Sequence, residues 1–202
     1  EILSADVYNK WKSLTGHGPT EGLGSTEVLH IYLSNTYDDH RLGSAGGRVP
    51  GYEIKLETPE GHAPMPGEEG VMYVRGHSSA PLYWNRPDKT KDTMRGDWIY
   101  TGDRFIEKDG FYYFQGRADD LVKISGQWVW PLEVERCLNE HPDVHECAIV
   151  AHELDDRRMT LSAFVCLRDG ITETPNHTKQ LQDFVKSKLL PYKYPRSVRF
   201  LQ

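Results

Sequence analysis

The chain has 202 residues, a formal net charge of −6 at pH 7, and 38% hydrophobic and 27% charged residues. This balance is typical of a folded globular protein rather than a disordered one, and the length allows one large domain or two small ones. The negative net charge argues against general binding to nucleic acid or to an anionic membrane surface. No apolar run is long enough to span a bilayer, and the first residues lack the basic-then-apolar order of a signal peptide.

Residues 4–15 predict an amphipathic helix with Ser4 as its N-cap and Gly16 just beyond its end. We expect this helix to be scaffold. Its apolar face is formed by Val7, Tyr8, Trp11 and Leu14.

The segment GHGPTEGLGSTEVLHIYLSN follows at residues 16–35. Gly22 and Gly24 allow the backbone to turn sharply or to approach a ligand closely. Thr26 adds a hydroxyl and Glu27 a carboxylate, but the segment matches neither a phosphate-binding P-loop nor a dinucleotide fingerprint. By pattern alone a turn or helix cap explains these residues better than a ligand site does.

The patterns of residues 43–117 predict short strands. Residues 52–57 alternate with period two, residues 71–74 form an apolar run, and residues 106–114 form a hairpin around Asp109-Gly110. Together they predict a small antiparallel, barrel-like β-rich subdomain. Between the strands, Trp84 and Trp98 are expected to serve packing.

Two charged residues close this β-rich part. Asp103, in a Thr-Gly-Asp turn at a strand end, can accept two hydroxyl hydrogen bonds from a ribose, although a turn-stabilising aspartate is the plainer interpretation. The guanidinium fork of Arg117 suits phosphate or ribose contacts, with a surface ion pair as the alternative.

The pattern changes after Arg117. A short apolar strand is expected at residues 121–125, and Pro131 suits the first turn of a helix. Two strands, a second amphipathic helix and a last strand complete a compact βαββαβ module of residues 118–202. These later elements are predicted at residues 144–151, 159–167, around 181–189, and 198–201.

The cysteines are odd in number, widely spaced and set in apolar patterns. They predict reduced core thiols in a cytoplasmic protein, and a disulfide or zinc site is not expected. They are Cys137, Cys147 and Cys166.

The order of these motifs resembles the adenylate-forming (AMP-binding) enzymes: acyl- and aryl-CoA ligases, nonribosomal adenylation domains and luciferases. GLGSTEVLHIYLSN is similar to the benzoate-type CoA ligase version of the motif that receives the acyl-adenylate. The resemblance implies that residues 1–117 are the C-terminal end of a large AMP-binding domain, including the β-rich subdomain 43–117. Residues 118–202 would then be a mobile C-terminal α+β domain.

The resemblance also implies roles for single residues. Thr26 and Glu27 would be catalytic: Thr26 would bond the α-phosphate, and Glu27 would hold Mg²⁺. Gly24 and His30 would border the aryl-acid pocket, although a histidine in an apolar run is by itself more often a core residue. The implied nucleotide-binding set is Gly22, Leu23, Gly24, Ser25, Thr26, Asp103 and Arg117.

In the second half of the chain the resemblance implies a hinge and a thiol loop. Asp119 matches the pivot about which the small domain turns between the two half-reactions. The loop lining the thiol tunnel would comprise Lys123, Ser125, Gly126, Gln127 and Trp128.

The implied reaction uses ATP, Mg²⁺, a small aromatic carboxylic acid and coenzyme A as a substrate. The acid attacks the α-phosphate to give an acyl-adenylate and pyrophosphate, and a thiol then displaces AMP. Because charge gathers on the phosphate in the first step, fixed cations and hydrogen-bond donors are expected to dominate catalysis. No nucleic-acid or membrane partner is expected.

The sequence also departs from the family pattern. Many relatives carry an aromatic residue at Leu23, relatives usually carry apolar strand residues where this chain has residues 17–20, and Trp130 is larger than expected beside the glycine loop. The catalytic lysine is expected beyond Gln202, because Lys193 belongs to an earlier structural stretch, and the phosphate loop upstream of Glu1. The 202-residue chain alone is therefore expected to be inactive.

Two alternatives stay open at this point. An adenylation domain that feeds a carrier protein would share these motifs. A non-catalytic fragment that binds a nucleotide or a protein partner would retain the fold without turnover.

Overall fold

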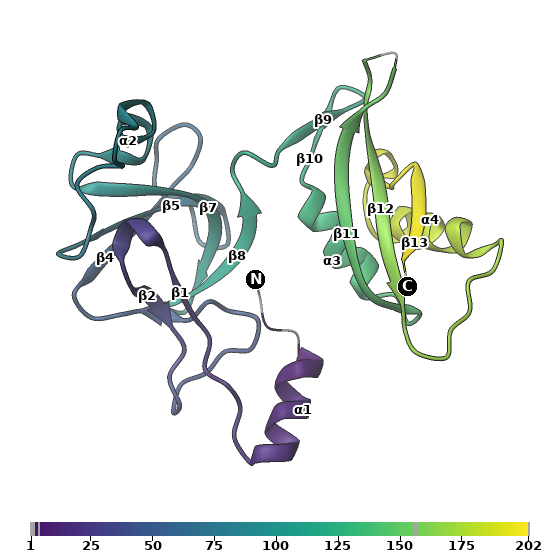
Figure 1. Cartoon of the computed structure of the whole chain (residues 1–202), viewed down its shortest axis with the longest axis horizontal. Coiled ribbons are helices and arrows are strands. Elements are labelled where there is room, and N and C mark those ends of the chain that lie inside the picture. Colours follow the sequence, from purple (N-terminus) through teal and green to yellow (C-terminus); the bar gives the residue numbers. More distant parts are fainter. Residues whose placement is uncertain (1–2, 4, 156, 202) are drawn as a thin grey trace. The chain divides into compact units, whose positions relative to one another are not determined.

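The computed structural model describes residue 3, residues 5–155 and residues 157–201, and the chain divides into two compact units (Figure 1). Unit 1 comprises Glu1–Ala118 and unit 2 comprises Asp119–Gln202. Within the described ranges, no helix has the length and apolarity that crossing a membrane requires.

Unit 1 begins with helix α1 (Ala5–Thr15), in the place where the residue spacing predicts a helix. The expected N-cap, Ser4, lies outside the described residues. Gly16, with φ of +81°, donates its N–H to the carbonyl of Lys12 at 2.9 Å and ends the helix. The apolar face of α1 is open: Val7, Trp11 and Leu14 are 54%, 53% and 77% exposed.

An antiparallel sheet makes up most of unit 1, with strand order β1-β2-β3-β8-β7-β5-β4 and β6 paired to β7 (Figure 1). This confirms the predicted antiparallel β-rich architecture. Helix α2 (Pro87–Thr93) and the short 3₁₀ helix η1 (Thr26–Val28) lie between strands. The strands are β1 (Gly22–Gly24), β2 (Ile31–Ser34), β3 (Gly47–Arg48), β4 (Tyr52–Glu57), β5 (Glu69–Gly76), β6 (Met94–Arg95), β7 (Trp98–Lys108) and β8 (Phe111–Arg117).

The predicted hairpin around Asp109-Gly110 joins β7 to β8. Asp109 and Gly110 have φ of +53° and +81°, the pair of positive values that a two-residue type I′ turn requires. The buried core of unit 1 lies under this sheet and consists of Val28, Tyr32, Leu33, Met72, Val74, Ile99 and Phe105.

The packing role predicted for Trp84 is wrong. Its side chain is 84% exposed in the turn before α2, where Asn85 has a left-handed φ of +53°, while the neighbouring Tyr83 is half-buried. Trp98 does pack: it is half-buried, and the Arg75 guanidinium lies 4.9 Å from its ring centre.

Unit 2 contains a three-stranded sheet of order β11-β12-β13 and a separate β9–β10 hairpin. β11 and β12 are antiparallel, whereas β12 and β13 are parallel. The α+β prediction is confirmed. The structure adds one strand, β10, which has only three residues and therefore no recognisable sequence pattern. The elements are β9 (Val122–Ile124), β10 (Gln127–Val129), α3 (Pro131–Asn139), β11 (Val144–Glu153), β12 (Met159–Leu167), α4 (His177–Lys188), η2 (Pro191–Lys193) and β13 (Ser197–Leu201).

The core of unit 2 joins both helices to the sheet. Val134 and Leu138 of α3 and Leu181 and Val185 of α4 are fully buried with apolar residues of β11 and β12. Cys137 is buried in this cluster, and Cys147 and Cys166 are half-buried; all three are free thiols.

Candidate functional site

The predicted ligand motif of unit 1 forms a tight turn between β1 and β2. Val28 is fully buried and anchors η1, which leaves Thr26 exposed and Glu27 half-buried. Leu29 ends the turn with a left-handed φ of +69°. The motif therefore presents its hydroxyl and its carboxylate at the surface while its apolar member holds the turn in place.

The two glycines of the motif are required by chain packing. A Cβ on Gly24 would lie 2.5 Å from the carbonyl oxygen of His30, and one on Gly22 would lie 2.9 Å from Ile31. β1 shifts register at Gly24, so β2 passes very close to it. Their identity is thus explained by the close approach of two strands, with or without a ligand.

A segment distant in sequence, residues 78–83, clamps this turn. Ala80 N–H donates to the carbonyl of Glu27 at 2.7 Å, and the Ser78 hydroxyl donates to the carbonyl of Val28 at 2.6 Å. The phenol of Tyr83 donates to Oε1 of Glu27. These contacts fix both the backbone and the side chain of Glu27.

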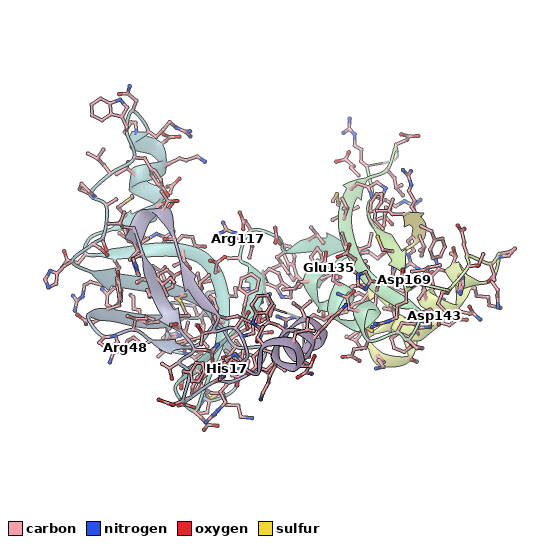
Figure 2. All side chains as sticks on the ribbon, turned by 60° about the horizontal axis from the view of Figure 1, so that its bottom comes forward. His17, Arg48, Arg117, Glu135, Asp143 and Asp169 are labelled. Atoms are coloured by element: carbon pink, nitrogen blue, oxygen red, sulfur yellow. The ribbon has the colours of Figure 1, made fainter. Side chains whose placement is uncertain are left out.

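Residues 101–103 do not form the predicted turn at a strand end, because β7 continues through them to Lys108. They form an irregularity within the strand, where Gly102 has φ of +72° and the β5–β7 register shifts. Arg117 lies opposite them on β8. Asp103 is in register with Arg117, and Nη1 of Arg117 lies 3.2 Å from Oδ1 of Asp103 and donates to the carbonyl of Thr101 at 3.1 Å. Gly102, with φ of +72°, leaves room for this guanidinium, since a Cβ there would lie 2.9 Å from Nη2 (Figure 2, with Arg117 labelled). The pair is partly open to solvent, at 20% exposure for Asp103 and 45% for Arg117.

The charge of Arg117 acts on Glu27, so the β1–β2 motif and the Asp103–Arg117 pair lie near each other in unit 1. Burial raises the pKa of Glu27, but the hydrogen bond from Tyr83 and its own backbone N–H, together with the charge of Arg117, outweigh burial and hold the pKa below its ordinary value. Glu27 is therefore ionised at neutral pH.

Tyr32 is the residue that sequence reasoning missed. It is 1% exposed; burial raises its pKa, and the negative charges of Asp103 and Glu27 raise it further. Tyr32 thus lies within electrostatic reach of both carboxylates. Its neighbour Leu33 is fully buried as well, so β2 shows no simple alternation that would single out Tyr32.

The remaining unit 1 candidates differ in exposure. His30 is exposed, so the interpretation as a core histidine is wrong. Leu23 is half-buried and packs against the core of unit 1, and Ser25 is half-buried.

The unit 2 candidates lie on an exposed loop and hairpin. Asp119 and Asp120 are exposed and belong to a turn between β8 and β9. In the β9–β10 hairpin, Ile124 and Val129 face the core, whereas Lys123 and Trp128 form a cross-strand pair with the Lys123 ammonium 5.5 Å from the ring centre.

The turn of this hairpin has a strained backbone. Ser125 and Gly126 both have positive φ, +50° and +83°. Trp128 is 58% exposed, and Ser125, Gly126 and Gln127 are exposed as well. The loop therefore offers open backbone and an aromatic face to solvent.

Lys193 has a structural partner. Its Nζ lies 2.6 Å from Oε2 of Glu133, its side chain is 16% exposed, and Glu133 also accepts from the N–H of Trp130 at the start of α3. This ion pair agrees with the structural role expected for Lys193.

The donor set at Glu27 fits Mg²⁺. A single ionised carboxylate supplies a hard oxygen ligand, and no group of three or more His, Cys, Asp or Glu residues suited to a metal occurs among the described residues. Mg²⁺ is commonly bound by one or two carboxylates together with substrate phosphates and water, so this sparse set is adequate for it.

Comparison with known proteins identifies the family. The model of the AMP-binding enzyme family matches residues 1–84, and that of the AMP-binding enzyme C-terminal domain matches residues 133–202. This chain belongs to the AMP-binding enzyme family. A benzoate–CoA ligase of Thauera aromatica is 40% identical over 203 residues, covering 100% of this chain and 38% of the relative.

Solved structures of the AMP-binding family agree. A benzoate CoA ligase from Burkholderia xenovorans superposes with a TM-score of 0.87 at 38% identity, covering 100% of this chain and 40% of that one. An anthranilate CoA ligase in complex with anthranoyl-AMP gives a TM-score of 0.83 at 38% identity, covering 100% and 39%. This chain thus spans about two fifths of the length of these relatives.

Proposed function

We propose that this chain supplies part of the active site of an ATP-dependent aryl acid–CoA ligase of the benzoate type. The observation that carries the proposal is the grouping of Glu27, Asp103 and Arg117 around Tyr32 in unit 1. The relatives named above as benzoate and anthranilate CoA ligases support the aryl-acid substrate class.

The side chains of unit 1 suit the adenylation step. The exposed hydroxyl of Thr26 would donate to the α-phosphate, and Asp103 would accept hydrogen bonds from the ribose hydroxyls. Arg117 would add a fixed positive charge close to the same nucleotide. Preorganised groups of this kind stabilise a phosphoryl transition state because they require no reorganisation as charge develops.

Glu27 would hold Mg²⁺. Its lowered pKa keeps the carboxylate charged, and because Tyr83 donates to Oε1, the ion would bind through Oε2. When bound, Mg²⁺ would offset the negative charge of the phosphates.

Gly24 and His30 would border the aromatic acid. Both residues are exposed, Gly24 at the end of β1 and His30 just before β2. The acid would be a small aromatic carboxylate, by analogy with the named relatives.

Unit 2 would serve the second step, in which CoA displaces AMP. The exposed hairpin turn with Ser125, Gly126 and Gln127 would line the path of the pantetheine arm of CoA. The Lys123–Trp128 pair would flank that arm. Asp119, exposed at the first position of unit 2, would be the pivot that changes backbone angles between the two steps.

The proposal is tested with the full-length protein. Pyrophosphate release and CoA-thioester formation are measured with benzoate, ring-substituted benzoates and a fatty acid of similar solubility. We expect aryl-acid-dependent release followed by the aryl-CoA thioester. Absence of aryl-acid-dependent pyrophosphate release would overturn the assignment, and release without a CoA thioester would favour a carrier protein as the acceptor.

A further inference from the structure

We propose that Tyr83 is a positioning residue for Glu27: its phenol fixes one oxygen of the carboxylate so that the other is aimed at the metal ion. This inference rests on the proposed function, because it concerns the carboxylate assigned there to Mg²⁺. The two residues are 56 positions apart, and the Tyr83 hydroxyl donates directly to Oε1 of Glu27.

Tyr83 is itself held firmly by the turn that follows it. Its N–H donates to Oγ1 of Thr90 at 2.9 Å, and the Thr90 hydroxyl donates in turn to the carbonyl of Arg86 at 2.8 Å. Trp84, the next aromatic residue, is 84% exposed, so the turn directs one ring inward and the other outward. The phenol is therefore delivered to Glu27 by an anchored backbone.

The backbone and the side chain of Glu27 are held by different groups. Ala80 N–H binds the carbonyl of Glu27, and Ser78, which also bonds the Tyr52 hydroxyl at 2.9 Å, binds the carbonyl of Val28. Removing the Tyr83 hydroxyl would leave these contacts intact. The change would act on the direction of the carboxylate alone.

A carboxylate that binds a metal benefits from such a contact. The glutamate side chain has three rotatable bonds, and an ionised oxygen accepts an O–H hydrogen bond that is about twice as strong as a neutral one. Hydrogen-bonded partners of this kind orient ligating carboxylates, and their removal commonly costs roughly 10- to 100-fold in metal affinity or activity.

The test uses the full-length protein in three forms: wild type, Tyr83→Phe, and the control Tyr113→Phe, which removes a half-buried phenol hydroxyl from β8. Pyrophosphate release is measured against Mg²⁺ concentration at saturating ATP and acid. We expect the half-saturating Mg²⁺ concentration to rise about 10- to 100-fold in Tyr83→Phe, with the control unchanged and much of the rate recovered at high Mg²⁺.

A second measurement is independent of turnover. Mn²⁺ binding to the enzyme with a non-hydrolysable ATP analogue is followed by electron paramagnetic resonance, and we expect weaker Mn²⁺ binding in Tyr83→Phe than in the control. Thr90→Ala, which keeps the phenol but loosens its anchor, should shift both measurements in the same direction. If Tyr83→Phe does not fold, the two measurements on Thr90→Ala decide the proposal instead.

The outcomes separate the two proposals. An active wild type whose Mg²⁺ dependence and Mn²⁺ affinity are unchanged by Tyr83→Phe would overturn the positioning role and leave the proposed function intact. A wild type without aryl-acid-dependent pyrophosphate release would overturn the proposed function, and the Mn²⁺ measurement would then decide the role of Tyr83 alone.

Discussion

At the scale of single residues, Glu27 is the residue that we propose to hold Mg²⁺, a role that requires an ionised carboxylate. Partial burial raises its pKa, but the hydrogen bond from Tyr83 and the charge of Arg117 act in the opposite direction, and the net shift is downward. A structural turn needs no charged side chain at this position, so the arrangement favours a role in ligand binding.

The low pKa of Glu27 makes a pH-dependent prediction. A carboxylate whose folded-state pKa lies below its unfolded value stabilises the fold above the unfolded pKa, about 4.3, and loses that contribution as pH falls through the folded pKa. Glu27→Gln should therefore be less stable than wild type near pH 6, and this difference should shrink as the pH is lowered below about 4. Urea unfolding of both full-length proteins between pH 3.5 and 7 checks it. A stability difference that stays constant over that range would contradict the electrostatic account.

At the scale of elements, the β7–β8 hairpin carries the Asp103–Arg117 pair, and two of its glycines test what each end of the hairpin contributes. Gly102 and Gly110 both have left-handed φ, +72° and +81°. A Cβ at Gly110 would meet open space, whereas one at Gly102 would meet the Arg117 guanidinium.

The two glycine-to-alanine variants can be compared directly. Gly102→Ala and Gly110→Ala should each cost about 1–2 kcal/mol in the free energy of unfolding, because each forces a Cβ into the left-handed region. Only Gly102→Ala should also weaken AMP binding, since it displaces Arg117 from Asp103. Calorimetric AMP titration and urea unfolding of both full-length variants measure the two effects. Equal AMP affinities would show that the guanidinium position is immaterial to the nucleotide.

The elements also show what sequence patterns reveal. The hairpin at Asp109-Gly110, the helix of residues 131–139 and the long strands of unit 2 follow from local turn chemistry and periodicity, so they were predictable. β10 has only three residues, which are too few to show the period-two alternation of a strand. The Tyr83–Glu27 contact joins residues 56 positions apart, which no local pattern encodes.

The residues of the candidate site also differ in whether the sequence predicts them. Asp103, Arg117 and Glu27 were found because their motifs resemble a known family, and the structure brings them near one another within unit 1. Tyr32 and Tyr83 were missed because buried or half-buried tyrosines in apolar surroundings look like ordinary packing. For Gly22 and Gly24 the sequence predicts either a sharp turn or close approach to a ligand, and the structure shows that β2 lies too close to Gly24 for a side chain there.

At the scale of the whole molecule, the chain forms two compact units, and we propose that each unit serves a different half-reaction. In the proposal, unit 1 would contact the nucleotide and unit 2 would supply the thiol loop, and Asp119 is the first residue of unit 2. An enzyme with two half-reactions can use such a division if one unit reorients between steps.

Asp119→Pro tests the pivot. Proline fixes φ near −65° and removes the N–H, so it restricts the rotation that a hinge requires. We expect the adenylation and thioester-forming rates of the full-length protein to fall unequally, while Asp119→Ala, whose backbone stays free, shows a smaller imbalance. Separate assays of the two half-reactions measure this. An equal loss in both would remove the hinge role.

The most direct test of the central claim is aryl-acid-dependent ATP–pyrophosphate exchange by the full-length protein, compared between wild type and Asp103→Ala. Hydrogen bonds to a charged group contribute about 1.5–3 kcal/mol, so the variant should lose roughly 10- to 150-fold in kcat/KM for ATP. We predict exchange that requires benzoate or a close analogue and falls by this amount in Asp103→Ala. Exchange that does not depend on an aromatic acid, or that is unchanged in Asp103→Ala, would contradict the account.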